Sequence, residues 1–385
     1  MMDYNFNFIP RLEPWAIGLK PWAPEPKPYL FGSAFILMLF LSSVSMAQTD
    51  TTITEEEDFS MYENLDFADA GAKRFCTPKV FDLSPAKLIS FGYDHQGAFG
   101  IDYGKVSDTT WQSGQGNFSG AGGLRLGANI PVISKTNVVW QLGFNYARTT
   151  FSGEGEAFVN PLDATLRSNG LTTTGIHTTL FKPLGEEKFI IAQGSADLNG
   201  DYYLDNFTPL QYTRYSAALI YGKKKSDRKM IGFGLARTYR VGELNYIPVM
   251  LLNWTAPNRK WGVEMLAPAR AHIRKSLSAR NILLFGYELE GNSYRVLRGD
   301  VNNPRGYELR RGELRFRAVW ETSMYQFIWM SLQAGYRYGY SFDMDNFAPT
   351  DNEFFRGFFG DQLYAQENEF KGTWYAQLSV NLVSP

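Results

Sequence analysis

Apolar and polar residues alternate along most of the chain from Ser84 onward. In the last segment, Trp374, Ala376, Leu378, Val380 and Leu382 are apolar, whereas Tyr375, Gln377, Ser379 and Asn381 lie between them. Segments 138–146, 313–321 and 327–340 repeat the pattern. Because successive side chains of a strand point to opposite faces of a sheet, this period of two predicts strands with one apolar and one polar face.

Turn signals divide this region into fourteen predicted strands. They lie near 86–103, 119–130, 137–151, 171–182, 188–199, 212–222, 230–240, 246–255, 261–267, 270–278, 281–294, 311–321, 326–341 and 372–383. A soluble sandwich and a membrane barrel both alternate in this way. Small residues on the polar faces and aromatic residues near the strand ends favour the barrel, whose apolar face points outward.

The connections between these strands alternate in length. Residues 104–118, 152–170, 200–211, 295–310 and 342–371 form long connections, and 131–136, 183–187, 223–229, 256–260, 279–280 and 322–325 form short ones. Short periplasmic turns and long external loops are typical of outer-membrane barrels. The sequence therefore predicts an all-β protein, a transmembrane antiparallel β-barrel of about fourteen strands, with twelve to sixteen possible.

The connections predict a low part of the barrel wall, and the membrane requires the sheet to close. Connections 241–245 and 268–269 should be long but are tight, so the strands beside them stop low and leave a notch in the wall. An open sheet edge is forbidden in lipid, so the first strand must pair with the last. The last strand ends Leu382-Val383-Ser384-Pro385, which departs from the terminal Phe of the sorting strand that the barrel-assembly machinery recognises.

The N-terminal part predicts export. Residues 1–28 form an extension of uncertain status, rich in proline. In residues 29–47, the apolar run 30–41 precedes Ser45-x-Ala47, which indicates a signal peptide, although a single-pass anchor is the alternative. Residues 48–83 are polar and acidic and predict a flexible periplasmic leader, and 84–385 form the barrel.

Composition narrows the function classes. The chain of 385 residues has 38 basic and 39 acidic side chains, which argues against a nucleic-acid partner. Its single cysteine, Cys76, excludes a disulfide framework and a cysteine-based zinc site. No cofactor motif is present, so no cofactor is expected. The expected partners are outer-membrane lipid, the barrel-assembly machinery and small solutes.

Charged side chains gather on the polar faces of the C-terminal half. The candidate cluster comprises Glu264, His272, Arg274, Glu288, Glu290, Glu313, Arg315, Arg317, Glu321 and Arg337, and the N-terminal half adds Asp94, Arg125, Asp197 and Arg214. Charged rings set the selectivity of pores, which makes the cluster a candidate constriction. The alternative is a ladder of ion pairs that fills a lumen too narrow to conduct.

An enzyme is not expected. The three histidines are His95, His177 and His272, and the neighbours Asp94 and His95 must point to opposite faces of their strand. His177 is interpreted as a structural hydrogen-bonding residue, with a lipid hydrolase at the barrel rim as a weak alternative. Loop 342–371, rich in Phe and acidic residues, is interpreted as a plug or cover of the barrel mouth, with a gate as the alternative.

Four runs of sequence carry a family resemblance. Residues 262–271, 285–294, 308–315 and 333–338 resemble a family of exported Gram-negative outer-membrane barrels that is catalogued as a domain of unknown function. The resemblance covers roughly residues 85–383 and implies a fold and a location, but no activity and no site residues. The function expected from the residues is a passive or weakly selective channel for small solutes. The alternative is a closed structural barrel that displays loops 152–170 and 342–371.

Overall fold

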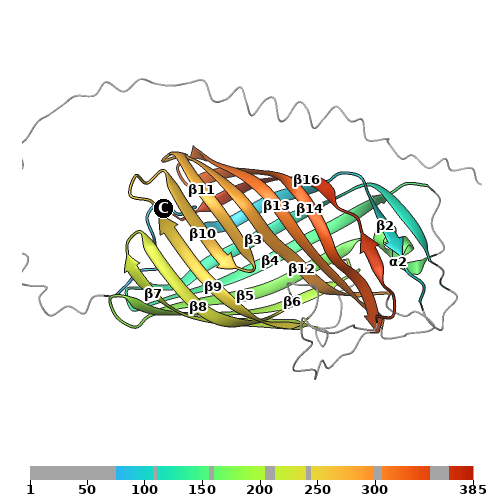
Figure 1. The fold of residues 1–385 in the computed structure, drawn as a ribbon, viewed down its shortest axis with the longest axis horizontal. Coiled ribbons are helices and arrows are strands. Elements are labelled where there is room, and N and C mark those ends of the chain that lie inside the picture. The colour runs from blue at the N-terminus through green and yellow to red at the C-terminus, as the bar shows by residue number, and fades with distance from the viewer. Residues whose placement is uncertain are drawn as a thin grey trace, which may run out of the picture. The chain divides into compact units, whose positions relative to one another are not determined.

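The computed structural model describes residues 75–106, 111, 113–155, 160–203, 213–239, 244–297, 306–346 and 364–384. These residues form sixteen β segments and one helix (Figure 1). They are β1 (Lys87–Gln96), β2 (Phe99–Tyr103), β3 (Gly114–Lys135), β4 (Val138–Gly153), α2 (Pro161–Ser168), β5 (Leu171–Pro183), β6 (Lys188–Gly200), β7 (Arg214–Ser226), β8 (Lys229–Thr238), β9 (Asn245–Thr255), β10 (Trp261–Ala267), β11 (Arg270–Ser278), β12 (Asn281–Val296), β13 (Tyr307–Tyr325), β14 (Ile328–Asn346), β15 (Asn368–Phe370) and β16 (Thr373–Val383).

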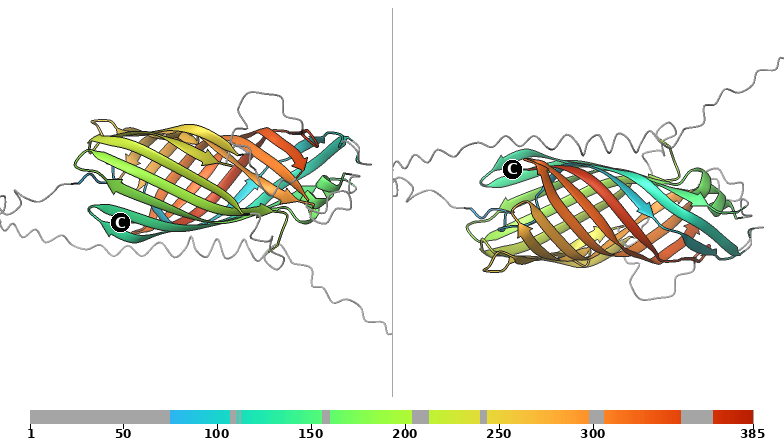
Figure 2. Two further views of the ribbon diagram at one scale, coloured as in Figure 1. Left: turned by 90° about the horizontal axis from the view of Figure 1, so that it is seen from below. Right: turned by 90° about the horizontal axis from the view of Figure 1, so that it is seen from above.

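The sheet closes on itself. β1 pairs with β16 in the register Phe91↔Val380 and with β3 in the register Phe91↔Leu126. β1 and β2 are one interrupted strand, as are β15 and β16, so the closed antiparallel ring has 14 strands (Figure 2). The predicted fold, the strand number and the pairing of the first strand with the last are confirmed.

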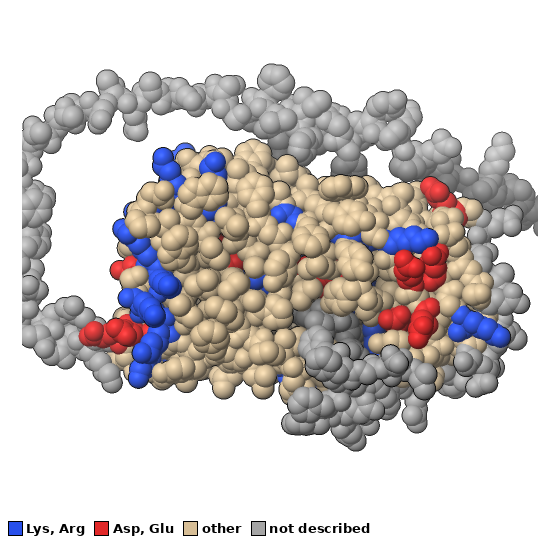
Figure 3. All heavy atoms as spheres, in the orientation of Figure 1, with Lys and Arg blue, Asp and Glu red and all other residues tan. Residues whose placement is uncertain are grey.

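The outward face of the ring is apolar and the inward face is mostly polar. Ile176, Leu219 and Phe233 point outward and are exposed, whereas their sequence neighbours point into the lumen. Charged side chains gather at the two ends of the face seen in Figure 3 and leave a mostly uncharged surface between them. This is the pattern of a barrel whose middle lies in hydrocarbon, and the chain is a transmembrane β-barrel.

The barrel wall is low at β10 and β11, as the tight connection 268–269 predicts. β10 has 7 residues and β11 has 9, whereas the next strand, β12, has 16. Above the hairpin tip, β12 meets β6 instead of β11: Arg295 pairs with Gly200, and the Asp201 amide donates to the Arg295 carbonyl oxygen at 3.2 Å. The end of the barrel that bears the long connections, the long-loop end, is therefore narrowed by a contact that bypasses β7–β11.

An apolar core fills this long-loop end. Phe99, Phe118, Phe151 and Phe370 pack ring to ring in its centre. Helix α2 adds Leu162 and Leu166, both fully buried. We refer to the cluster as the long-loop core: Phe99, Ile101, Tyr103, Val106, Trp111, Phe118, Ala121, Phe151, Leu162, Leu166, Leu171, Tyr294, Val296, Tyr307, Leu309, Phe342, Met344 and Phe370.

Helix α2 lies within the connection 152–170 and was not predicted. Its N-cap, Asn160, accepts a hydrogen bond from the Leu162 amide at 2.8 Å, and Pro161 occupies the first turn, where no amide partner is needed. Asp163 is buried and accepts from Arg167 at 2.7 Å and from Tyr103 at 3.0 Å. This part of the connection packs inward, so helix α2 is not displayed as the alternative of a closed, loop-displaying barrel supposes.

Residues 75–86, here called the strap, line the opposite, short-turn end. The Cys76 amide donates to Gly185 in the β5–β6 turn at 2.9 Å, and the Phe81 amide donates to Asp227 in the β7–β8 turn at 2.9 Å. The Ser84 amide then donates to Glu264 on β10 at 2.9 Å. Residues 84–87 run from this contact on β10 to the start of β1. Because β1 and β10 are several strands apart in either direction around the ring, this short segment crosses the mouth of the barrel.

The strap corrects the predicted boundary of the flexible leader. Residues 75–83 pack on the barrel, because Cys76 and Val80 are buried with Phe181, Phe189 and Ile220. The extension 1–28, the signal peptide 29–47 and the leader to residue 74 lie outside the described residues, as does 347–363 of the predicted plug. The described end of that loop returns to the barrel, where β15 pairs with β2 and Phe370 joins the long-loop core. No helix in the described segments is long and apolar enough to span a membrane.

Candidate lumen site

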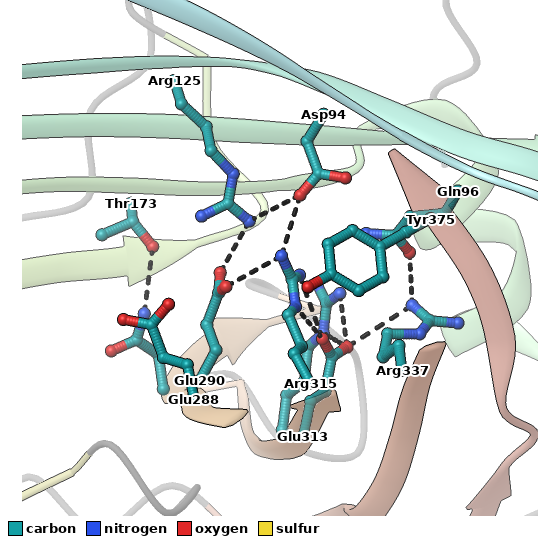
Figure 4. Close-up of polar contacts among 12 residues, drawn as sticks. Asp94, Gln96, Arg125, Thr173, Glu288, Glu290, Glu313, Arg315, Arg337 and Tyr375 are labelled. Carbon is teal, nitrogen blue, oxygen red and sulfur yellow. Dashed lines mark hydrogen bonds and ion pairs between the residues drawn. The ribbon is translucent and has the colours of Figure 1, made fainter. Parts of the chain in front are cut away.

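The inward faces of β1, β3, β12, β13 and β14 bring a set of charged side chains together in the lumen. Arg315 on β13 is central: its Nη1 lies 2.9 Å from Asp94 Oδ2 and 2.9 Å from Glu290 Oε2, and its Nη2 lies 3.1 Å from Glu313 Oε2 (Figure 4). The strands alternate, so residues two apart, such as Glu313 and Arg315, share the lumen face. One guanidinium thus joins carboxylates from three strands.

Three more arginines complete the cluster. Arg125 Nη2 lies 3.0 Å from Asp94 and 2.6 Å from Glu290, and Arg311 Nη2 lies 2.6 Å from Glu313. Arg337 Nη1 lies 3.4 Å from Glu313 and also donates to Gln96 (Figure 4). We call Asp94, Arg125, Glu290, Arg311, Glu313, Arg315 and Arg337 the ion network.

One side of the ion network is dry and the other is wet. The Arg337 side chain is fully buried, with its guanidinium carbon 4.0 Å from the Phe370 ring centre and 4.7 Å from that of Phe99. The side chains of Arg125 and Glu290 are 26% and 34% exposed. The long-loop core therefore seats one edge of the network, while Arg125 and Glu290 face open lumen. Burying an unpaired charge is costly. The ion pair with Glu313 and the aromatic contacts of Arg337 offset the cost of burying its guanidinium.

The other predicted charges form separate groups at other heights. Arg317 pairs with Glu288 and donates to His272 Nε2 at 3.0 Å. Arg274 Nη1 lies 3.1 Å from Glu264, which also holds the strap. The additional candidate Glu321 pairs with Lys87 Nζ at 2.8 Å. Arg214 pairs with Glu308 at 2.9 Å, and Asp197 accepts a hydrogen bond from Ser195 at 3.0 Å. The structure therefore divides the predicted candidates among the ion network and several separate groups.

The wall opposite the ion network carries small polar side chains. We call it the polar wall: Gln141, Asn145, His177, Thr179, Gln193, Ser195 and Asp197 on β4–β6. Gln193 points into the lumen between Thr179 and Ala218, and it is exposed. Its short neighbours leave the Gln193 amide exposed to the lumen at this height.

The three histidines lie in separate environments. His177 Nε2 lies 2.6 Å from Asn129 Oδ1. Ser195, its partner across the strands, donates its hydroxyl to Asp197 Oδ2 at 3.0 Å, so that proton is directed to a carboxylate. As expected, Asp94 is buried in the lumen and His95 is exposed on the outer face. Among the described residues, no group of three His, Cys, Asp or Glu side chains could hold a metal ion.

One member of the ion network, Arg311, and one uncharged partner of the network, Gln96, were missed by sequence reasoning. Arg311 lies two residues before Glu313 on the same face, so extending the alternation by one step would have found it. Gln96 is two residues from Asp94 on β1 and could have been found in the same way. That Asp94 meets Arg315 on β13, and that Arg125 meets Glu290 on β12, depends on how far the strands are staggered around the ring, which alternation does not specify.

Comparisons with known proteins add similarities of fold. No protein-family model matches the chain, and no curated protein matches it. An outer membrane channel from Pseudomonas putida F1 is 11% identical, with a TM-score of 0.37 over 80% of this chain and 99% of that one. A bacterial polysaccharide outer membrane secretin is 11% identical, with a TM-score of 0.33 over 78% and 100%. A deltaS2 mutant of the monoaromatic hydrocarbon channel TodX is 8% identical, with a TM-score of 0.29 over 78% and 91%. The fold assigned here rests on the strand pairing of this chain.

Proposed function

We propose that this barrel is a narrow, weakly selective channel for small solutes in the outer membrane. The observation that carries the proposal is the polar wall, where Gln193 faces the lumen and is exposed. A solute in this space would meet Glu288, Glu290 and Arg125, whose side chains are partly exposed on the opposite side. Charged side chains at a constriction set ion selectivity, so these three residues are the proposed filter.

The proposed orientation follows from the connections. Barrels of the outer membrane have short periplasmic turns, and here the short turns and the strap share one end. The leader that precedes the strap would then emerge in the periplasm, as expected for an exported chain. The long-loop core would lie at the cell surface.

Two packed regions restrict the path. The long-loop core is dry and aromatic, and the strap crosses the short-turn mouth. We therefore expect a low conductance that increases when either region is loosened. Selectivity at the ion network and access at the two ends are separate properties in this proposal.

A closed structural barrel is the second candidate. It is favoured by the extensive pairing within the ion network and by the dryness of the long-loop core, both of which a scaffold with no solute path would also need. The two candidates differ in one measurable property, which is passage of ions through the inserted protein.

The deciding experiment is single-channel conductance of the purified full chain in a planar bilayer. We expect small discrete steps, reduced by Gln193→Trp, which places a large ring in the proposed path. Leu219→Trp is the matched control, because Leu219 faces lipid on the adjacent strand and its replacement should leave the steps unchanged. Glu288→Gln should raise the ratio of anion to cation permeability. Verified insertion without steps would overturn the channel proposal and leave the closed barrel.

A further inference from the structure

Lysines end the outward faces of four adjacent strands at the short-turn end. On β5, Lys182 follows the lipid-facing Leu180, and on β6, Lys188 precedes Ile190. On β7, Lys223 and Lys225 follow Tyr221, and on β8, Lys229 precedes Ile231. We call Lys182, Lys188, Lys223, Lys225 and Lys229 the lysine cluster. Its members share the outer face of the barrel, directly beyond the apolar belt.

The lysine cluster is the densest group of outward lysines at this end, because Lys135 on β3 and Lys275 on β11 each stand alone on their strand. At the same level, the outward faces of β9, β10 and β13 carry Trp254, Trp261 and Trp320. Aromatic residues of this kind are the ordinary boundary of a membrane barrel. Lys275 lies over the ring of Trp261, with its Nζ 5.1 Å from the ring centre, whereas β5–β8 place five lysines on four adjacent strands. This density indicates a local site.

Two of these lysines face each other. Lys188 and Lys223 are direct cross-strand partners, and both are exposed on the outer face. Like charges at such a position destabilise a sheet unless an anion lies between them. Within the described residues, no ion pair to a carboxylate is found for any lysine of the cluster. Asp227, the acidic residue of the β7–β8 turn, pairs instead with the lumen-facing Lys224 at 2.9 Å.

We propose that the lysine cluster binds the headgroup of an anionic phospholipid in the leaflet at the short-turn end of the barrel. The occupant is a lipid because the lysines stand just beyond side chains that contact acyl chains, such as Leu180 and Tyr221. Lys188 and Lys223 hold the phosphodiester between them, and the surrounding lysines attract the leaflet's negative charge. Figure 3 shows basic side chains along the short-turn end of the visible face.

The test compares lipids retained by the purified full chain in native mass spectrometry. The protein is exchanged into bilayer discs of phosphatidylethanolamine with either phosphatidylglycerol or phosphatidylcholine. We expect selective retention of phosphatidylglycerol, reduced by roughly twenty-five-fold in Lys188→Gln/Lys223→Gln, because each lysine near an anionic surface contributes roughly a factor of five. The control Lys260→Gln/Arg280→Gln removes two exposed positive charges from turns elsewhere on the same end and should retain the lipid.

Three outcomes would overturn the proposal. Equal retention by the lysine variant and its control would show that the lysine cluster is not the site. Full displacement of phosphatidylglycerol by inorganic phosphate would show a simple phosphate site. If selective retention appears only after the leader acids Glu55, Glu56, Glu57 and Asp58 are replaced by amides, the leader and not a lipid is the occupant. A second pair, Lys182→Gln/Lys225→Gln, should weaken retention less, because neither residue belongs to the facing pair.

Discussion

Arg315 and Asp94 are 221 positions apart in the chain, yet Arg315 Nη1 lies 2.9 Å from Asp94 Oδ2 in the closed lumen. The contact joins the first strand of the barrel to β13. It can form only once the ring has closed, because β1 reaches this position through its pairing with β16. The ion network is therefore a consequence of barrel closure as well as a filling for the lumen.

We predict that Arg315→Met strongly destabilises the barrel. The substitution leaves Asp94, Glu290 and Glu313 without their shared cation, and removing one partner of a buried pair costs about 3–5 kcal/mol. The loss of folding free energy is measured by unfolding in urea, with the folded and unfolded barrel distinguished by their electrophoretic mobility. Phe316→Met is the control, because Phe316 faces lipid beside it. Equal stability of the two variants would contradict the assignment of Arg315 as the centre of the network.

Cys76 reports directly on the strap. It is the only cysteine of the chain and is buried, and burial raises the pKa of its thiol above the ordinary value. Because the thiolate is the reactive form, we predict slow alkylation of the folded protein at neutral pH and fast alkylation in denaturant. Val80→Asp should speed alkylation by more than about tenfold, since it places an unpaired charge in the apolar contact of the strap. Lys79→Asp, an exposed neighbour, should not.

The strap should also loosen in acid. Hydrogen bonds from Arg259 lower the pKa of the Asp82 carboxyl, with both contacts at 2.7 Å. A carboxyl whose folded pKa is depressed stabilises the fold at pH above its unfolded value of about 3.9, and this contribution is lost as pH falls through the folded pKa. A pyridyl disulfide labels a thiol even in acid, by exchange to a mixed disulfide that releases thiopyridone. Its reaction with Cys76 should therefore accelerate as pH falls through the folded pKa of Asp82. Asp82→Asn should label faster at neutral pH and lose this acid step; an unchanged acid step would contradict the assignment.

The alternation of side chains was enough to predict the barrel, because successive residues of every strand face lipid and lumen in turn. It located β10 and β11 as short strands because Pro268-Ala269 leaves no room for a loop. It missed the beginning of β3, where Gly114 and Gly116 provide no apolar side chain to alternate with polar ones. It also missed α2, which is too short to show a helical period and is fixed by its cap and by contacts with distant strands.

The candidate site was predicted less completely, for a physical reason. Alternation states which face a side chain occupies but not its height in the barrel. Glu264 and Arg337 were therefore placed in one cluster, although Glu264 holds the strap and Arg337 lies against the long-loop core. Height depends on the stagger of neighbouring strands, which is fixed by closure of the whole ring.

The long-loop core should act as a seal as well as a source of stability. Leu166 on α2 is fully buried in it, and truncating a buried leucine costs about 2–5 kcal/mol because a cavity replaces packed side chain. We predict that Leu166→Ala lowers the urea midpoint and raises single-channel conductance or open probability, since α2 then packs less firmly over the lumen. Ile176→Ala, which removes apolar surface facing lipid, should change neither property strongly. A destabilised Leu166→Ala barrel with unchanged conductance would separate the two roles and place the solute path away from the long-loop core, toward the low wall at β10 and β11.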